Sequence, residues 1–496
     1  MLHIRATRDI PRQNIRKGDE FHLYIVDFHH HMGREKSHQN TPSGAYEFYT
    51  LLWFEMQKIS KDMSESDSFL FEPLGVVPTP MVSDLFEAKK SWNRLNHGWL
   101  IDRSVVFPYT DDYSMSGYPD KPSFHTSNEK IAGWTTRPPN SARLIGFCRV
   151  DPLDGSKISK ESAVKELDYA IGTLGLRGLK LHPLAQLFVD AIEDDLTARV
   201  MKRAAEWCIP VIFDTRNINT AIKIQNLVSQ VREDNPSLSN DLKVVLAHCG
   251  MNPGDSRLYR ILRDPAIYGE TSSLHGKDIP VLFEMAQERI RIMGESWSNK
   301  ILFGTDYSFL SVQAIDLILF LLTHEFPGTL ADAQKILAGN ALTLINRPFF
   351  SKSKTITKSQ QYSFSYDRAE PIKEFLIKLF LKKDIDLASL DVMIPPSSTW
   401  PDLEPLQNGG YNGIHFDSLI ASLRKRDGSK ELHLWLRENL GLVRLSLLQS
   451  HGDKSLKKLE LTSDSIPQSL YEELESTNVQ TDSFGEILSH VSEIFS

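Results

Sequence analysis

The sequence predicts an α/β protein: a (β/α)8 barrel of the TIM-barrel kind, followed by a smaller, mainly helical C-terminal domain. Three observations lead to this prediction. Eight short runs rich in leucine or β-branched residues recur along the first part of the 496-residue chain. Segments with helical periodicity separate most of these runs. Titratable side chains directly follow many of the runs, as they do where the carboxyl ends of barrel strands form an active site.

The eight apolar runs are the predicted barrel strands. From the third run onward their spacing is about 20–35 residues, which is typical of successive strand–helix units. An open, doubly wound sheet is the alternative, but it would gather the functional residues at one switch point instead of at many strand ends. The predicted strands are Leu23–Phe28, Ser104–Phe107, Leu144–Val150, Leu176–Leu181, Pro210–Phe213, Val244–Ala247, Ala266–Gly269 and Ile301–Phe303.

Helices are predicted where apolar residues recur at helical spacing after the strands. An insertion at residues 32–101 separates the first two strands, and its segment Tyr46–Ile59 is apolar and helical in pattern. Because an insertion after the first strand lies on the catalytic face, we expect either a lid or substrate wall, or a structural cover on the barrel top. The other predicted helices are Ser162–Thr173, Leu196–Cys208, Thr220–Arg232, Ile279–Met293 and Leu330–Ile345.

Composition divides the chain into three parts. Residues 1–350 hold the predicted barrel, residues 351–365 are a linker rich in Ser, Thr and Lys, and residues 366–496 form the C-terminal domain. In that domain the apolar residues of Leu432–Leu448 recur at helical spacing. No catalytic pattern is visible there, so the domain is a candidate surface for a protein partner or for homo-oligomer formation. Its shorter predicted helical stretches are Ile372–Phe380, Phe416–Leu423, Leu470–Leu474 and Phe484–Phe495.

Charge and cysteine content narrow the class of protein. The net charge is −8 and no basic patch dominates, which argues against a nucleic-acid partner. The three cysteines, Cys148, Cys208 and Cys249, are far apart in apolar runs and are typical of reduced core residues in an intracellular protein. The N-terminal segment has no apolar signal-peptide core, and no apolar stretch is long enough to span a membrane. We therefore expect a cytoplasmic protein with a small-molecule substrate.

The run Val26-Asp27-Phe28-His29-His30-His31 carries the densest chemical signal. It lies at the exit of a predicted strand, where side chains alternate between the two faces. His29 and His31 therefore share one face and His30 points to the other. Two imidazoles in this arrangement can bind one divalent metal ion, although an ordinary histidine cluster would look the same in isolation.

Similar signals follow the other predicted strands. A buried run of Val, Leu and Ile that ends in a histidine or an aspartate is unfavourable unless the polar group is paired or binds a metal. Because the carboxyl ends of barrel strands meet at one mouth, these side chains are expected to converge. They are Lys180 and His182 after the fourth strand, Asp214 after the fifth, His248 after the sixth, Glu270 and Ser272 after the seventh, and Asp306 after the eighth.

The order of these motifs over residues 22–347 resembles the amidohydrolase superfamily. Within it, the pattern is closest to the branch of metal-dependent hydrolases and decarboxylases related to aminocarboxymuconate semialdehyde decarboxylase. The motifs are His29-His30-His31, GLKLHP at 178–183, AHCG at 247–250, FGTDY at 303–307 and GNA at 339–341.

The resemblance implies a distorted barrel that binds one or two divalent metal ions, usually zinc. It implies that His29 and His31 are metal ligands and that Asp306 is both a ligand and a proton shuttle. It also implies that His248 acts as a base or stabilises the transition state. The C-terminal third of the chain lies outside the resemblance.

One position departs from the family pattern. The family usually has histidine at the end of the fifth strand, whereas this chain has Asp214. An aspartate can still bind zinc through oxygen, and additional oxygen ligands favour harder ions such as Mn²⁺. Alternatively, Asp214 pairs with Arg216 or Lys180. Lys180 itself is either a charge partner or, as in binuclear members, a carboxylated bridge between two metals. We expect one Zn²⁺ ion, with Mn²⁺ or a second metal as alternatives.

The predicted activity is metal-dependent hydrolysis of a small-molecule amide, lactone or related bond by a metal-activated water. Asp306 would accept the proton of that water, and His248 would stabilise the developing oxyanion. One alternative is non-oxidative decarboxylation of an aromatic or enol acid. Another is a catalytically reduced barrel that serves as a scaffold or regulatory subunit. The predicted substrate contacts are Lys180, His182, Arg216 and Glu270.

Overall fold

The structure is a computed structural model that describes most of the N-terminal part of the chain and selected strands of the C-terminal part. Its Cα positions divide into two compact units, one made of residues 1–77, 98–354 and 405–411 and the other of the remaining residues. Each unit is described by itself. The described residues are 1–35, 38–64, 68–76, 99–110, 122–135, 143–154, 159–309, 313–345, 364–365, 387–393, 402–405, 411–416, 418–425, 431–439, 442–451 and 455–459.

A six-stranded parallel sheet forms one side of the first unit, in the order β13-β12-β11-β10-β9-β8. Its central strands are continuous runs of Val, Ile, Leu and Phe that are buried on both faces, as is typical of a parallel sheet covered by helices. The strands are β8 (Cys148–Arg149), β9 (Leu179–Leu181), β10 (Pro210–Phe213), β11 (Lys243–Leu246), β12 (Ile267–Glu270) and β13 (Ile301–Leu302).

A second sheet has the order β4-β3-β6-β7, in which β3, β6 and β7 are parallel and β4 is an antiparallel edge strand. At one side β7 leads directly into β8 through Phe147, whose N–H donates to Val106 O at 2.9 Å. At the other side β3 meets the chain around β13: Phe28 N–H donates to Phe303 O at 2.9 Å, and His31 N–H donates to Tyr307 O at 2.6 Å. The strands are β3 (Val26–Glu35), β4 (His38–Asn40), β6 (Arg103–Pro108) and β7 (Leu144–Gly146).

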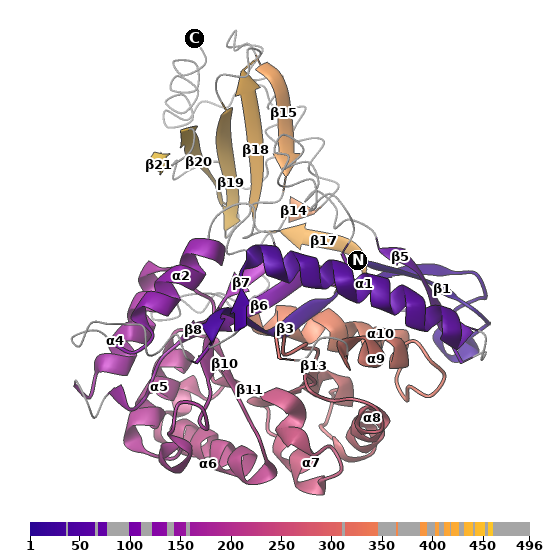
Figure 1. Ribbon diagram of the computed structural model, residues 1–496, viewed down its shortest axis with the longest axis horizontal. Coiled ribbons are helices and arrows are strands. Elements are labelled where there is room, and N and C mark those ends of the chain that lie inside the picture. The colour runs from indigo at the N-terminus through magenta and orange to yellow at the C-terminus, as the bar shows by residue number, and fades with distance from the viewer. Residues whose placement is uncertain are drawn as a thin grey trace. The chain divides into compact units, whose positions relative to one another are not determined.

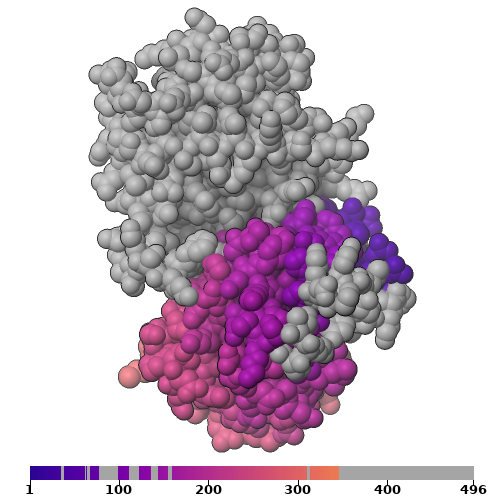
Figure 2. Space-filling view, turned by 90° about the vertical axis from the view of Figure 1, so that its left-hand side faces the viewer, coloured from indigo at the N-terminus to yellow at the C-terminus, as the bar shows by residue number. Residues whose placement is uncertain are grey.

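Helices follow most of the parallel strands, and Figure 1 shows α4 to α8 on the outside of β10, β11 and β13. Figure 2 shows that the magenta and pink segments carrying such helices form a continuous outer surface on the face seen there. Their apolar stripes are turned inward, as in α5, where Val200, Met201, Ala204 and Ala205 are buried. The helices are α2 (His125–Thr135), α4 (Ser162–Asp168), α5 (Asp195–Glu206), α6 (Ile218–Asp234), α7 (Ser256–Leu262), α8 (Asp278–Arg289), α9 (Gln313–Phe320), α10 (Leu330–Gln334) and α11 (Asn340–Ile345).

The predicted α/β class is confirmed, and each of the eight predicted strands has a counterpart. The Pro210–Phe213 strand has the predicted bounds, whereas β3 extends further than expected, to Glu35. The predicted run Leu144–Val150 is divided into β7 and β8. Among the residues that the structure describes, no helix has both the length and the apolar character needed to cross a membrane.

The N-terminal segment contains an antiparallel sheet that the sequence analysis did not predict. Its order is β2-β1-β5. The insertion at residues 32–101 contributes strand β5 to this sheet. It also contains α1, which includes the predicted helix Tyr46–Ile59 and extends beyond it at both ends. Phe48 and Tyr49 of α1 lie against the His30 ring, so this helix covers one face of β3. The elements are β1 (Leu2–Ala6), β2 (Glu20–Leu23), α1 (Pro42–Ser64) and β5 (Phe71–Val76).

The second unit corrects one prediction. Its described segments are strands, which form a five-stranded antiparallel sheet, β15-β18-β19-β20-β21, and a three-stranded sheet, β14-β17-β16. The helices expected over Leu432–Leu448 and Phe416–Leu423 are therefore wrong. The strands are β14 (Phe364–Ser365), β15 (Leu387–Met393), β16 (Asp402–Pro405), β17 (Tyr411–Phe416), β18 (Ser418–Lys425), β19 (Glu431–Asn439), β20 (Leu442–His451) and β21 (Ser455–Leu459).

These segments form strands because their apolar residues recur at every second position. Leu432, Leu434 and Leu436 alternate with other residues on β19, and the same spacing continues on β20 after Gly441. In the antiparallel register Leu434 pairs with Leu447, which places leucines opposite each other on neighbouring strands. The predicted stretches Ile372–Phe380, Leu470–Leu474 and Phe484–Phe495, and most of the predicted linker, lie outside the described residues.

Candidate metal centre

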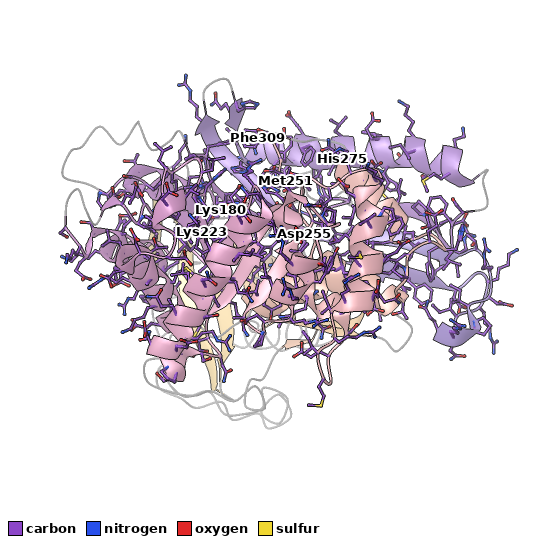
Figure 3. The ribbon with its side chains drawn as sticks, turned by 90° about the horizontal axis from the view of Figure 1, so that it is seen from below. Lys180, Lys223, Met251, Asp255, His275 and Phe309 are labelled. Carbon is purple, nitrogen blue, oxygen red and sulfur yellow. The ribbon has the colours of Figure 1, made fainter. Side chains whose placement is uncertain are left out.

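The predicted site residues come from the carboxyl ends of parallel strands, which share one edge of the first unit. Each of them except Arg216 is buried, with at most 7% of its surface exposed. Figure 3 labels Lys180 of β9 together with Met251, His275 and Phe309, which follow β11, β12 and β13. The structure brings together the predicted residues His29, His31, Lys180, His182, Asp214, Arg216, His248, Glu270 and Asp306 through the contacts given below.

Three ligand atoms face one another at the centre of this edge. His29 Nε2 lies 3.3 Å from His31 Nε2, and Asp306 Oδ1 lies 3.4 Å from the first and 3.2 Å from the second. These side chains form one of two candidate metal clusters among the described residues. Because β3 alternates its side chains, His30 lies on the opposite face, where it is buried and contacts Asn40.

The triangle fits a zinc-sized ion. Ligands about 2.0–2.1 Å from a tetrahedrally coordinated metal are about 3.3–3.4 Å from each other, close to the three observed separations. Within the described part of the chain, Asp306 Oδ1 is buried and accepts no hydrogen bond. Burial, together with the nearby Lys180 charge, holds the pKa of His29 and His31 well below the usual value, so both imidazoles are neutral, as metal ligands must be. Two imidazoles and one carboxylate are a typical set for a catalytic zinc with an open position.

The second candidate cluster, His29, His248 and Glu270, is held together by a hydroxyl. Ser272 Oγ lies 2.6 Å from Glu270 Oε2, 2.9 Å from His248 Nδ1 and 3.2 Å from His29 Nδ1. Burial raises the pKa of Glu270 to about 7. Because the polar atoms already hydrogen-bond through Ser272, this cluster requires no ion to satisfy them.

Asp214 lies in a network of basic side chains. Its Oδ1 accepts a hydrogen bond from Arg216 Nε at 2.8 Å. Its Oδ2 lies 3.1 Å from His248 Nε2, 3.4 Å from His182 Nε2 and 3.7 Å from Lys180 Nζ. Burial alone would raise the pKa of Asp214, but the neighbouring His182, His248 and Lys180 hold it well below its usual value. Asp214 thus makes the contacts with Arg216 and Lys180 that one alternative for this position expected, and among the described residues it belongs to neither candidate metal cluster.

Lys180 and His182 are both held near Asp214 by β9. Lys180 is fully buried, and its Nζ also lies 3.1 Å from His29 Nε2. Burial lowers the pKa of Lys180 to about 8 and that of His182 to about 3. Lys180 therefore reaches both the candidate metal ligand His29 and the Asp214 network.

His248 connects this network to the metal triangle. Burial disfavours its charged form, but Asp214 outweighs that effect and raises the pKa of His248. Its Nδ1 lies 3.1 Å from Ser273 Oγ, and the same hydroxyl donates to Asp306 Oδ2 at 3.1 Å. His248, Ser273 and Asp306 all have left-handed backbone conformations, with φ of 60°, 67° and 56°. Ser273 was missed by the sequence analysis, although it directly follows Ser272 at a strand exit.

An aromatic wall beside His31 was also missed. The Tyr109 ring is stacked on His31 with centroids 5.2 Å apart, and the Phe309 ring meets it edge-on at 5.0 Å. Tyr109 is buried, whereas Phe309 is 43% exposed and so reaches from the candidate site to the surface. Both residues follow predicted strands within a few positions, but aromatic residues there are also typical of ordinary core packing.

Residues 119–347 match the family model described as Amidohydrolase. No curated protein sequence matches the chain significantly. Among solved structures, an uncharacterized TIM-barrel protein from Bordetella bronchiseptica is 18% identical, with 65% of this chain and 98% of that chain covered and a TM-score of 0.38. The 4-oxalomesaconate hydratase from Rhodopseudomonas palustris is 16% identical, with coverage of 65% and 95% and a TM-score of 0.38.

The matched segment contains all the candidate residues that follow the later strands, from Lys180 to Asp306. It ends just after α11, the last helix of the first unit that the structure describes. His29 and His31 precede the segment, and the structure places them against Asp306 within it. Residues 119–347 of the chain are thus similar to the amidohydrolase family.

Proposed function

We propose that the chain is a metal-dependent hydrolase that acts on a small-molecule amide, lactone or related C–N or C–O bond. The observation that carries this proposal is the triangle of His29 Nε2, His31 Nε2 and Asp306 Oδ1, with separations of 3.2–3.4 Å. One Zn²⁺ ion suits this donor set, and the carboxylate also accommodates Mn²⁺.

The proposal includes a closed (β/α)8 barrel as the scaffold. The hydrogen bonds from Phe28 to Phe303 and from His31 to Tyr307 join the first parallel strand to the last. The bond from Phe147 to Val106 joins the two sheets at their other meeting point. In a closed barrel the carboxyl ends of all strands surround one mouth, which accounts for the convergence of residues that are far apart in the sequence.

A divalent metal at this position would lower the pKa of a bound water and polarise the scissile carbonyl. Asp306 has one oxygen in the ligand triangle, and its other oxygen, Oδ2, is placed to accept a proton. His248, whose pKa is raised by Asp214, is placed to donate a proton to the leaving group. Ser273 Oγ bridges these two groups, with both separations equal to 3.1 Å. Arg216, which is partly exposed beside Asp214, is the candidate contact for a polar substrate group.

The first experiment is metal analysis of the purified protein by mass spectrometry. We expect about one equivalent of Zn²⁺ or Mn²⁺ per chain, and loss of most of it in the variants His29→Ala and Asp306→Ala. His324→Ala is the matched control, because His324 is exposed and its ring hydrogen-bonds to the backbone carbonyl of Ser68, which is not one of the candidate site residues. Metal-free wild-type protein after growth with added zinc would reject the proposal and favour the scaffold alternative.

The second experiment identifies the reaction class. A panel of amides, lactones, cyclic imides and aromatic acids is incubated with the metal-loaded protein in water enriched in ¹⁸O. Hydrolysis puts the label into the product, because the attacking oxygen comes from water. Release of CO₂ without label in the remaining product would instead identify a decarboxylase.

A further inference from the structure

His29 makes a second contact, on the side of its ring away from the ligand triangle. Its Nδ1 lies 2.8 Å from Glu270 Oε2, and both side chains are fully buried. A carboxylate can only accept a hydrogen bond, so Nδ1 carries the proton and the lone pair is left on Nε2. The tautomer set by Glu270 is therefore the one that presents Nε2 as a ligand to His31 and Asp306.

Glu270 is itself fixed in place by the turn that follows β12. The Ser272 backbone N–H donates to Glu270 Oε1, and the Ser272 hydroxyl donates to Glu270 Oε2 at 2.6 Å. Both carboxylate oxygens thus accept hydrogen bonds from one residue, and this fixes the plane of the carboxylate. A group held in this way is oriented before any ligand arrives.

A glycine on the neighbouring strand exit makes room for this carboxylate. A Cβ atom at Gly304 would collide with Glu270 Oε1, lie 2.6 Å from Glu270 Cδ and lie 2.9 Å from His29 Cβ. Real Cβ atoms do not approach other atoms so closely, so any other residue at position 304 would displace the Glu270–His29 pair. The absence of a side chain at Gly304 thus leaves room for this pair.

From these three observations we propose that Glu270 is a positioning residue for the metal ligand His29, with Gly304 providing its space. The inference rests on the metal site of the proposed function and replaces the predicted substrate contact of Glu270. A carboxylate behind a ligating histidine fixes the ring orientation and increases its basicity, and its loss typically weakens metal binding about 10–100-fold. Glu270 acts through His29 and does not touch the metal.

The same unit contains a matched control for this pair. His125 Nδ1 lies 2.8 Å from Glu166 Oε2, the same separation as in the His29–Glu270 pair. Among the described residues this second pair belongs to no candidate metal cluster. Replacement of Glu166 therefore removes a partly buried carboxylate–histidine hydrogen bond of the same length, outside the proposed site.

The experiment measures the affinity for Zn²⁺ alone, by competition with a chromophoric chelator at pH 8. We compare wild type with Glu270→Gln, Glu270→Ala, Gly304→Ala and Glu166→Gln. We expect the dissociation constant to rise about 10-fold in Glu270→Gln, which keeps a neutral acceptor, and up to about 100-fold in Glu270→Ala and Gly304→Ala. Glu166→Gln should leave it within about twofold of wild type. Thermal unfolding of the metal-free variants verifies that each remains folded.

The absorption spectrum of the Co²⁺-loaded proteins gives a second readout that is independent of activity. We expect the band intensities to change in the Glu270 and Gly304 variants, because the His29 ring is no longer held in one orientation. Unchanged Zn²⁺ affinity and Co²⁺ spectra in folded Glu270→Gln and Gly304→Ala would overturn the inference. Loss of all binding in Glu270→Ala, with binding retained in Asp306→Ala, would also overturn it, because Glu270 would then be a ligand. Wild type that binds no Zn²⁺ would instead reject the proposed function.

Discussion

Replacement of Asp214 by Asn separates its two predicted roles. As a metal ligand it would be needed for metal binding; as the anion of a cationic network it would be needed for stability and for the charge of His248. Asn keeps the shape of the side chain and one acceptor oxygen but removes the negative charge. His248 Nε2, at 3.1 Å from Asp214 Oδ2, is the closest of the fully buried partners and so is affected most.

The magnitude follows from the separation and the burial. Unit charges about 3 Å apart attract by roughly 5 kcal/mol at an effective dielectric constant of about 20. Removal of one partner from a buried ion pair commonly costs about 3–5 kcal/mol. Because Lys180 and His248 can release protons once the anion is gone, we expect a value near the lower end, about 3 kcal/mol. The half-exposed Arg216 adds little, since water screens its charge.

The contribution of Asp214 to the free energy of unfolding depends on pH in a definite direction. The pKa of Asp214 is held well below its usual value in the folded protein, so its stabilising contribution is complete above the unfolded-state pKa of about 4. The contribution decreases as the pH falls through the folded-state value. Urea unfolding of wild type and Asp214→Asn should therefore differ by about 3 kcal/mol at pH 7, and the difference should shrink in acid.

The metal content of the same preparations gives the decisive comparison. We expect Asp214→Asn to keep about one equivalent of metal per chain, because Asp214 lies outside both candidate clusters. A variant that is as stable as wild type but has lost its metal would refute this reasoning. It would restore Asp214 to the ligand role that the strand-end pattern suggested.

Three further predictions concern other parts of the first unit. Ser273→Ala should lower the turnover rate on the order of 10-fold or more at unchanged metal content, because its hydroxyl links His248 to the proton-accepting carboxylate; equal rates would contradict this role. Lys300 is buried, and its pKa is lowered to about 8 in the folded protein. Above about that pH the Lys300 side chain is therefore still protonated in the unfolded chain but largely deprotonated in the folded chain. Wild type should gain stability relative to Lys300→Met between about pH 8 and 10, by at most about 1.4 kcal/mol per pH unit, and parallel pH profiles in urea unfolding would exclude this. Gly178→Ala should destabilise the fold by about 1–3 kcal/mol in urea, because its Cβ would lie 2.6 Å from Phe147 Cδ2; a change below about 0.5 kcal/mol would show that the ring moves aside easily.

The parallel strands of the first unit were predictable because two simple patterns coincide in them. Runs such as Pro210–Phe213 and Lys243–Leu246 are apolar throughout, and each ends in a titratable residue. On β3, the alternation of side chains between the two faces of the strand separated His29 and His31 from His30. Local sequence determines these features, since side-chain direction along a strand has a fixed period.

The partners of the site residues were not predictable in the same way. Nothing near Asp214 in the sequence shows that His248 and His182 meet its Oδ2 atom, because these contacts depend on how separate strands are aligned. Ser273 and Glu270 likewise acquire their roles only through contacts with residues at least 25 positions away in the sequence. A serine or a glutamate after a strand does not by itself indicate such a role.

The C-terminal strands show a different limit of prediction from sequence. Leucines are so frequent in Leu432–Leu448 that a helical spacing and an alternating spacing can both be found in it. Such short apolar runs are ambiguous from periodicity alone, and the choice is made by pairing with a neighbouring strand. The antiparallel register of β19 and β20 is a long-range property that no single segment contains.

The left-handed backbone at His248, Ser273 and Asp306 has a consequence for how this chain can change over time. An L-residue in that conformation is disfavoured by roughly 1–2 kcal/mol, whereas glycine adopts it freely. Glycine at any of the three positions would relieve strain while deleting a group of the proposed proton path. Stability and the proposed proton path thus make opposite demands on the same three backbone positions. Descendants released from selection for activity should drift toward glycine or asparagine there, and variants that retain all three side chains carry a persistent stability deficit.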